Sequence, residues 1–363
     1  MSAQNYEFGS AIGHFFKVFG RKPVATLWVI LWNTALMSAA VGLIFWAVAP
    51  AYLNMFDMAL NDVEPSGEQV LEMLGPIFLV MPLMMVGGIL TALLAQGAWL
   101  RLLVRGEVAA IIPFRLGGDE LRLFVVNLVM LALLVALEAV FFGLMITIAV
   151  ASGLQESGDG FAAAATMGGI LLLAVPVFLI ALLYFGIRFA AAPALTIYDR
   201  RIRIFDAWPA TKGIFWWLLL TYLVVAVIMI IADTVFGTMI QMAFLGAFLP
   251  DIFQFFQSME SGGDPTAWLQ TMIEQLRQPE AVGIIAIGVG LTIFLQTLYK
   301  GYWHSVGAYA AIRHRTVDDT DPVASQADPA PATIASTSTG DAEANSGSTA
   351  PAAPDSDEPG DKT

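Results

Sequence analysis

The sequence contains no cysteine, only three histidines and few charged residues. The absence of cysteine excludes disulfide scaffolds, thiolate metal sites and thiol nucleophiles. Charged residues make up 13% of the 363 residues, whereas soluble proteins carry about 25%. So few charges cannot cover a water-exposed surface, and hydrophobic residues make up 58% of the chain. Most of the surface must therefore face lipid or other helices, and we expect an integral membrane protein.

The signatures of nucleic-acid binding and of catalysis are also missing. A net charge of −13 excludes a protein that binds nucleic acid by neutralising its phosphates. None of the histidines, His14, His304 and His314, belongs to a His-Glu-x-x-His zinc motif. The chain has no Gly-x-Ser-x-Gly nucleophile elbow and no Walker glycine loop. We therefore predict no catalytic residue, no metal site, no cofactor and no enzymatic activity.

Six apolar stretches are long enough to cross the membrane, since ~30 Å of hydrocarbon takes about 20 helical residues. They predict an all-α polytopic membrane protein with six transmembrane helices arranged as three hairpins. An amphipathic N-terminal arm over residues 1–23 would precede a transmembrane domain over residues 24–315. The predicted spans cover residues 24–49, 76–100, 123–150, 167–189, 214–243 and 281–299.

The basic residues are sorted between the two sets of connections. Sixteen of the 17 lysines and arginines lie in the N-terminal arm, in the connections after the second and fourth spans, or after the sixth span. The opposite loops contain only Arg277, among many acidic residues. Cytoplasmic loops carry the excess of basic residues, so we expect both termini in the cytoplasm.

Residues 316–363 differ in composition from the rest of the chain. They are rich in Ala, Ser, Thr, Pro, Gly and Asp, and they contain ten acidic residues, one lysine and no aromatic residue. Such a segment cannot bury enough apolar surface to offset its ordering entropy, and we expect a disordered acidic tail. It would either bind a cytoplasmic protein partner or serve as a solvated extension without a specific role.

The outer loops show helix signals of their own. Ser66 followed by Gln69 forms a capping box that predicts a short helix through Leu74. Asp264-Pro265 predicts the start of another, which carries Trp268 on an apolar stripe. Residues 252–256 offer a further apolar face. We expect an outer layer of short helices that packs on the membrane surface or covers the mouth of the bundle.

Two carboxylates lie within the predicted spans, and intramembrane ionisable groups are candidate functional residues. Glu138 lies past the middle of the third span, and Asp233 lies near the outer end of the fifth. Glu138 could carry a proton or coordinate a cation with help from Asn33 or Asn127. Apart from Arg188 at the end of the fourth span, no basic residue lies within the spans to pair with Glu138, so we expect a neutral, hydrogen-bonded carboxyl group. A helix break near Pro82 would fit the same transport role.

The cytoplasmic connection after the fourth span combines arginines with a tryptophan. Arg200, Arg201 and Arg203 lie close in sequence to Trp208. Each basic residue near a bilayer surface gains about 1 kcal/mol from anionic lipid. We therefore predict that these four residues contact anionic lipid headgroups at the cytoplasmic face.

The stretch over residues 188–220 resembles a pattern of bacterial six-helix inner-membrane proteins. An Arg-Phe-x-x-x-Pro element leaves one span and a Thr-x-Gly-x-Phe-Trp element enters the next. The stretch is similar to the membrane domain that accompanies some glycerophosphodiester phosphodiesterases. The resemblance implies the fold alone, because this chain has no phosphodiesterase domain. The matching residues are Arg188, Phe189, Pro193, Thr211, Gly213, Phe215 and Trp216.

Two functions are compatible with these features. The first is a non-enzymatic accessory or scaffold protein that binds lipid or partner proteins through its basic cytoplasmic face. The second is a transporter of small solutes, or one coupled to protons or cations, that uses Glu138. A transporter should have a water-accessible cavity at Glu138, whereas a scaffold should have a tightly packed bundle.

Overall fold

The computed structural model describes residues 6–60, 66–151, 160–260, 274 and 278–320. These residues are helical or form short connections, and no β-strand occurs among them. They belong to a compact unit over residues 1–320. The predicted acidic tail lies almost entirely outside the described residues, since the last helix continues to Thr320.

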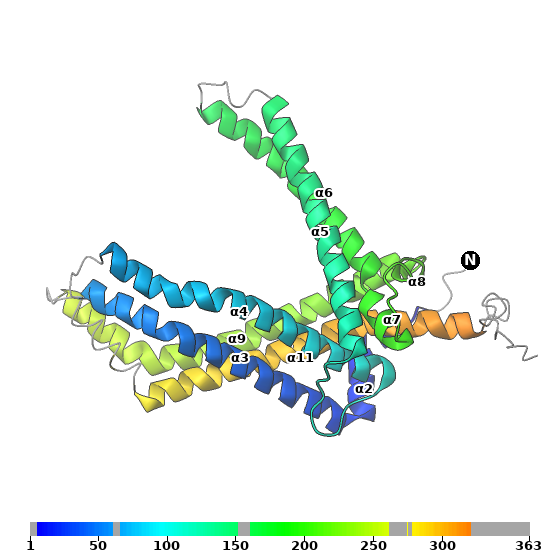
Figure 1. The fold of residues 1–363 in the computed structure, drawn as a ribbon, viewed down its shortest axis with the longest axis horizontal. Coiled ribbons are helices and arrows are strands. Elements are labelled where there is room, and N and C mark those ends of the chain that lie inside the picture. The colour runs from blue at the N-terminus through cyan, green and yellow to red at the C-terminus, as the bar shows by residue number, and fades with distance from the viewer. Residues whose placement is uncertain (1–5, 61–65, 152–159, 261–273, 275–277, 321–363) are drawn as a thin grey trace, which may run out of the picture. The chain divides into compact units, whose positions relative to one another are not determined.

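Six long helices dominate the compact unit. Each contains a stretch that is long and apolar enough to cross a membrane, which confirms the prediction of an all-α protein with six transmembrane helices. Such apolar segments form helices because a backbone in hydrocarbon must satisfy its own hydrogen bonds, and a helix does so within one segment. The helices are α3 (Pro23–Leu60), α4 (Gly67–Leu100), α5 (Gly118–Ala151), α6 (Gly160–Phe189), α9 (Phe215–Glu260) and α11 (Pro279–Thr320) (Figure 1).

The outer ends of these helices correct the prediction of a separate layer of short helices. The capping box is present, because the backbone N–H of Gln69 donates to Ser66 Oγ (3.3 Å) and the backbone N–H of Ser66 donates to Gln69 Oε1 (2.9 Å). The helix that begins there is α4 itself, which continues without a break at Pro82. In the same way, residues 252–256 belong to α9. The predicted helix around Trp268 lies outside the described residues.

The long helices exceed what the hydrocarbon requires. At 1.5 Å per residue, the 46 residues of α9 extend about 69 Å, roughly twice the ~30 Å hydrocarbon thickness. Part of α9 must therefore lie outside the hydrocarbon. Continuing the helix satisfies its backbone groups there without a new capping motif, which explains why residues 252–256 extend α9 instead of forming a separate short helix.

Short helical elements lie at one end of the long ones. In the N-terminal arm, Phe15 is buried and Phe16 is 59% exposed. The arm packs on the long helices, since the hydroxyls of Tyr6 and Thr221 share a hydrogen bond of 2.9 Å. The elements are α1 (Phe8–Ile12), α2 (His14–Arg21), the π-helical turn η1 (Arg101–Arg105), α7 (Ala192–Asp199) and α8 (Ala207–Thr211).

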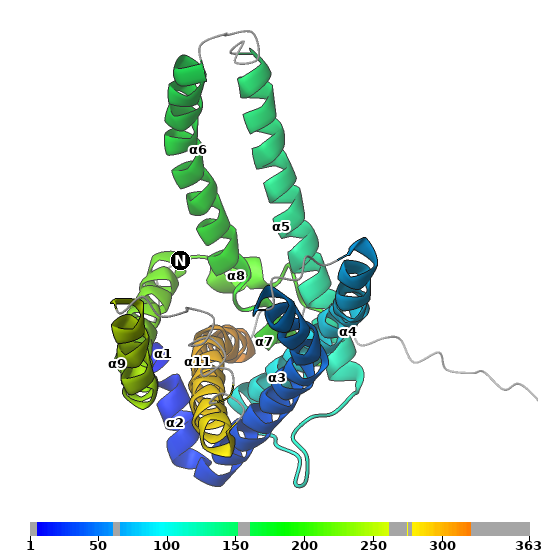
Figure 2. The same cartoon turned by 90° about the vertical axis from the view of Figure 1, so that its left-hand side faces the viewer.

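Consecutive long helices pack in pairs: α3 with α4, α5 with α6, and α9 with α11. Helix α11 also packs against α3 and α4 and links two of the pairs (Figures 1 and 2). Helices α5 and α6 join the others mainly through α4, α7, α8 and α9. The predicted arrangement as three hairpins stays a prediction, because α11 packs on α3 as well as on α9, and α5 packs on α4 as well as on α6.

The hydrophobic core lies where the short elements meet the long helices, a region we call the core end. From the α5–α6 pair, the fully packed residues in this core are Leu123, Val126 and Ile187, which lie near the helix ends that meet α7. The largest fully buried apolar side chains come from several elements: Trp99, Leu100, Leu102, Leu123, Leu195, Ile197, Leu218, Val29, Val126, Val225 and Val306.

Two buried charges at the core end, Arg101 and Glu120, are paired. Arg101 forms an ion pair with Glu120, both side chains being less than a tenth exposed, and donates from Nη2 to the carbonyl of Pro113 (3.0 Å). Burial lowers the pKa of His14, and its Nε2 lies 3.2 Å from the Leu103 carbonyl. Since the neutral Nε2–H can donate to that carbonyl, the neutral imidazole ties α2 to η1.

Candidate functional site

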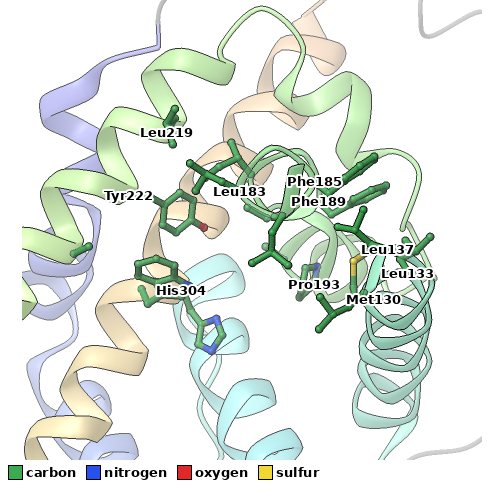
Figure 3. A pocket seen from close by; sticks show the side chains of 18 of the residues that line it. Met130, Leu133, Leu137, Leu183, Phe185, Phe189, Pro193, Leu219, Tyr222 and His304 are labelled. Atoms are coloured by element: carbon green, nitrogen blue, oxygen red, sulfur yellow. The ribbon is translucent and has the colours of Figure 1, made fainter. Parts of the chain in front are cut away.

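A cavity of about 890 Å³ lies between α4, α5, α6, α7, α9 and α11 (Figure 3). Helix α5 contributes a stripe that includes Met130, Leu133 and Leu137. Leu183 of α6 and Leu219 of α9 line it from other sides. The volume falls within the range of about 300–1,000 Å³ that is usual for small-molecule sites.

The lining of this cavity is almost entirely hydrocarbon. Nineteen of the 23 lining residues have no side-chain hydrogen-bonding group; the other four are Gln96, Tyr222, Trp303 and His304. The rings of Tyr222 and Trp303 pack together with their centroids 4.7 Å apart. An apolar cavity of this kind suits an acyl chain and offers little to hydrated ions.

Small residues shape the wall of the cavity at the turn between α6 and α7. A Cβ on Gly307 of α11 would lie 2.5 Å from the carbonyl oxygen of Ala190, which lines the cavity. Only glycine allows this approach. Pro193 stands in the first turn of α7, where its missing N–H costs no hydrogen bond. Close packing between the backbones of α11 and the α6–α7 turn therefore forms this wall of the cavity.

Of the four predicted polar candidates, two lie on α5. The side-chain amide of Asn127 donates to Gln96 Oε1 (2.7 Å), so Asn127 joins α5 to α4 at the edge of the cavity. Glu138 is half-buried, and it is not among the lining residues although Leu137 is. The structure thus places the cavity beside Glu138 but lines it with hydrocarbon.

The other two candidates lie on different helices. Asn33 of α3 is 1% exposed, and Asp233 of α9 is exposed. Within the described chain, no hydrogen bond or ion pair joins any two of Asn33, Asn127, Glu138 and Asp233. The predicted set therefore does not form one polar cluster.

The predicted lipid-contacting arginines have different surroundings. Arg203 pairs with Asp199 (3.3 Å) and Asp206 (2.9 Å), so internal carboxylates already neutralise it. Arg200 lies 3.4 Å from Glu107 as an exposed pair. Arg201 is exposed. Their contact with lipid stays a prediction, with Arg201 the best placed of the three.

The residues of the Arg-Phe-x-x-x-Pro and Thr-x-Gly-x-Phe-Trp elements come together at the core end. Arg188 lies among three aromatic rings, with its Cζ 5.3 Å from the centroid of Tyr184, 5.1 Å from Trp208 and 5.2 Å from Phe215. We call these four residues the arginine cage. The Thr211 hydroxyl donates to the Arg188 carbonyl (3.2 Å) and fastens α8 to the end of α6.

The sequence groups Trp208 with Arg200, Arg201 and Arg203 as predicted lipid contacts, whereas the cation that lies over its ring in the structure is Arg188. In the sequence, Arg188 is the basic residue at the end of an apolar run. That position was the available signal, because an arginine beside hydrocarbon needs a dedicated environment. The cavity itself had no sequence signal, since its lining residues resemble those that face lipid.

Comparison with known proteins adds no assignment. No protein-family model, no curated protein and no solved structure matches this chain. Among the described residues, no group of three or more histidine, aspartate or glutamate side chains could hold a metal ion. The cavity and the arginine cage are therefore the features on which a function can be argued.

Proposed function

We propose that this protein is a non-enzymatic accessory protein of the bacterial inner membrane that binds the acyl chain of a lipid in the cavity between its helices. The single observation that supports it is the nearly pure hydrocarbon lining of about 890 Å³ within segments apolar enough to span a membrane. In a bilayer the medium around these helices is lipid, so an acyl chain is the natural occupant.

The same proposal includes an orientation and a partner. The N-terminal arm and the end of α11 lie together, since the rings of Tyr6 and Tyr309 are 5.6 Å apart. The basic connections belong to this core end, which we assign to the cytoplasm by the positive-inside rule. The acidic residues 321–363 would then lie in the cytoplasm, where we propose that they bind a protein partner.

A photoreactive lipid tests the cavity. The full-length protein in detergent micelles would be labelled with a phospholipid that carries a diazirine on its acyl chain, and labelled peptides would be identified by mass spectrometry. We expect labels on α5 and α6 at lining residues such as Leu137 and Leu183. Labels confined to the outward faces of the helices would contradict the proposal.

A matched pair of glycine variants sharpens this test. Gly186 lines the cavity and Gly143 does not, and neither glycine has an atom within 4 Å of an added Cβ. Gly186→Trp fills the cavity, and we expect labelling of the lining residues to fall about tenfold, equivalent to ~1.4 kcal/mol of lost binding. Gly143→Trp should leave labelling unchanged. Equal labelling of both variants, with unchanged thermal stability, would refute an occupied cavity.

We do not extend the proposal to transport. Glu138 stays a candidate for proton or cation coupling, but it is not a lining residue and no break interrupts α4 at Pro82. Proton flux in proteoliposomes that depends on Glu138, and is lost in Glu138→Gln, would favour the transport function instead.

A further inference from the structure

Arg188 differs from Arg101 and Arg315 in having no carboxylate acceptor among the described residues. Arg101 has Glu120, and Arg315 has Asp199. Within the described chain, Arg188 forms no ion pair, and its Nε and Nη1 atoms are buried without a hydrogen-bond partner. Burying a hydrogen-bond donor without an acceptor is unfavourable, and more so when the donor is charged.

The aromatic rings of the cage meet only part of this need. Cation–π contacts stabilise the positive charge, but a ring face cannot take the two parallel hydrogen bonds that a guanidinium edge offers. The cage is also open to a ligand, because Arg188 is only half-buried and Trp208 is 38% exposed. The guanidinium of Arg188 thus lies beside three aromatic rings, and its hydrogen-bond donors have no acceptor among the described residues.

The position of the cage indicates which acceptor would complete it. Arg188 lies in the last turn of α6, at the end of an apolar span, and contacts Phe215, which directly precedes Trp216 and Trp217 in α9. Arginine and tryptophan at a span end lie at headgroup depth. Of the anions present at that depth, phosphate matches the planar guanidinium edge in a bidentate geometry.

We propose that the arginine cage binds the phosphate group of a membrane phospholipid through the free donor edge of Arg188. The rings of Tyr184, Trp208 and Phe215 hold the guanidinium, and the Thr211 hydrogen bond to the Arg188 carbonyl keeps α8 beside it. Arg188 is not a lining residue of the cavity, so this headgroup site goes beyond the acyl-chain proposal.

Native mass spectrometry of the full-length protein in detergent tests the proposal. The probes are dioleoyl-phosphatidylglycerol, dioleoylglycerol, which lacks the phosphate, and inorganic phosphate. We expect the native protein to bind phosphatidylglycerol at least about tenfold more tightly than dioleoylglycerol, and Arg188→Gln to lose that difference. Arg188→Lys keeps the charge without the planar edge, and it should retain only part of the difference.

Arg115→Gln is the matched control. Arg115 is an exposed arginine of the connection between η1 and α5 and is not among the predicted lipid contacts, so its loss should leave the preference for phosphatidylglycerol unchanged. Equal binding of the two lipids by the native protein overturns the proposal. A preference that survives in Arg188→Gln also overturns it. Displacement of phosphatidylglycerol by millimolar inorganic phosphate would assign the site to a free anion and overturn the lipid assignment.

Two further readouts keep the outcomes separate. Melting temperatures without lipid show whether Arg188→Gln folds. If it does not fold, the preference of the native protein for phosphatidylglycerol over dioleoylglycerol, and its partial loss in Arg188→Lys, still test the proposal. Gly186→Trp should weaken binding of both lipids, because it blocks the acyl chain, whereas Arg188→Gln weakens phosphatidylglycerol alone. A failure of the cavity proposal is thus distinct from a failure of the headgroup site.

Discussion

At the scale of single residues, the buried charges of this protein differ in what neutralises them. Arg101 meets a carboxylate and a backbone carbonyl, whereas Arg188 meets three aromatic rings. Both arginines stand near the ends of apolar runs, and their sequence surroundings do not distinguish them. The partner of Arg101 is Glu120, 19 residues away and on another helix. Pairing of this kind follows from helix packing, which sequence spacing cannot supply.

We expect Glu120→Gln to destabilise the protein strongly. The substitution keeps the shape of the side chain but leaves the buried Arg101 charge without its counter-charge, which typically costs about 3–5 kcal/mol. The measurement is the free energy of unfolding in detergent. Glu107→Gln is the control, because Glu107 is about half exposed and exposed pairs contribute about 0–1 kcal/mol. Equal effects of the two variants would contradict the role of the buried pair.

At the scale of helices, glycine positions decide how closely α11 approaches its neighbours. A Cβ on Gly301 would lie 2.7 Å from Cη2 of the buried Trp99 on α4. Gly290 of the same helix has no atom within 4 Å of the corresponding position. The sequence analysis could identify six helices from apolar length, but it could not tell these two glycines apart. Their difference depends on which residue of another helix lies opposite.

We expect Gly301→Ala to lower the stability of the protein by about 1–3 kcal/mol, because the added methyl group overpacks the contact between α11 and α4. Gly290→Ala should be neutral or slightly stabilising, by up to ~1 kcal/mol, since it restricts the unfolded chain without a clash. Thermal unfolding of both variants in the same detergent provides the measurement. A Gly301→Ala variant as stable as the native protein would show that Trp99 can move aside.

At the scale of the whole molecule, the basic connections and the hydrophobic core lie at the same end of the helices. The connections rich in lysine and arginine belong to the end where α1, α2, η1, α7 and α8 surround the core. The acidic N-terminus of α4, with Glu68 in its first turn, belongs to the outer loops. The proposal that the core end lies in the cytoplasm is easy to test, because the sequence contains no cysteine.

Single cysteines introduced into the native chain report the orientation. Glu68 and Lys212 are both exposed, one at the outer end of α4 and the other just before α9. We expect a membrane-impermeant maleimide to label Glu68→Cys in intact spheroplasts and Lys212→Cys only after the membrane is permeabilised. The reverse pattern would place the core end outside the cytoplasm.

The sequence by itself determined the fold class, the number of spans and the sorting of charges. These features depend on properties summed over many residues. A helix needs about 20 apolar residues to cross the hydrocarbon of a membrane, and orientation depends on the number of basic residues in whole loops. The helix ends were less predictable. A capping box identified the start of α4 correctly, but it could not show that the same helix continues to Leu100.

The tertiary structure alone decided the cavity and the arginine cage. A leucine that lines a cavity and a leucine that faces lipid are the same residue in the same periodic pattern, and only the neighbouring helices separate them. The acceptors of a buried arginine likewise come from residues distant in the chain, as Glu120 does for Arg101. The proposed function depends on such pairwise proximity, whereas the membrane character of the protein depends on composition.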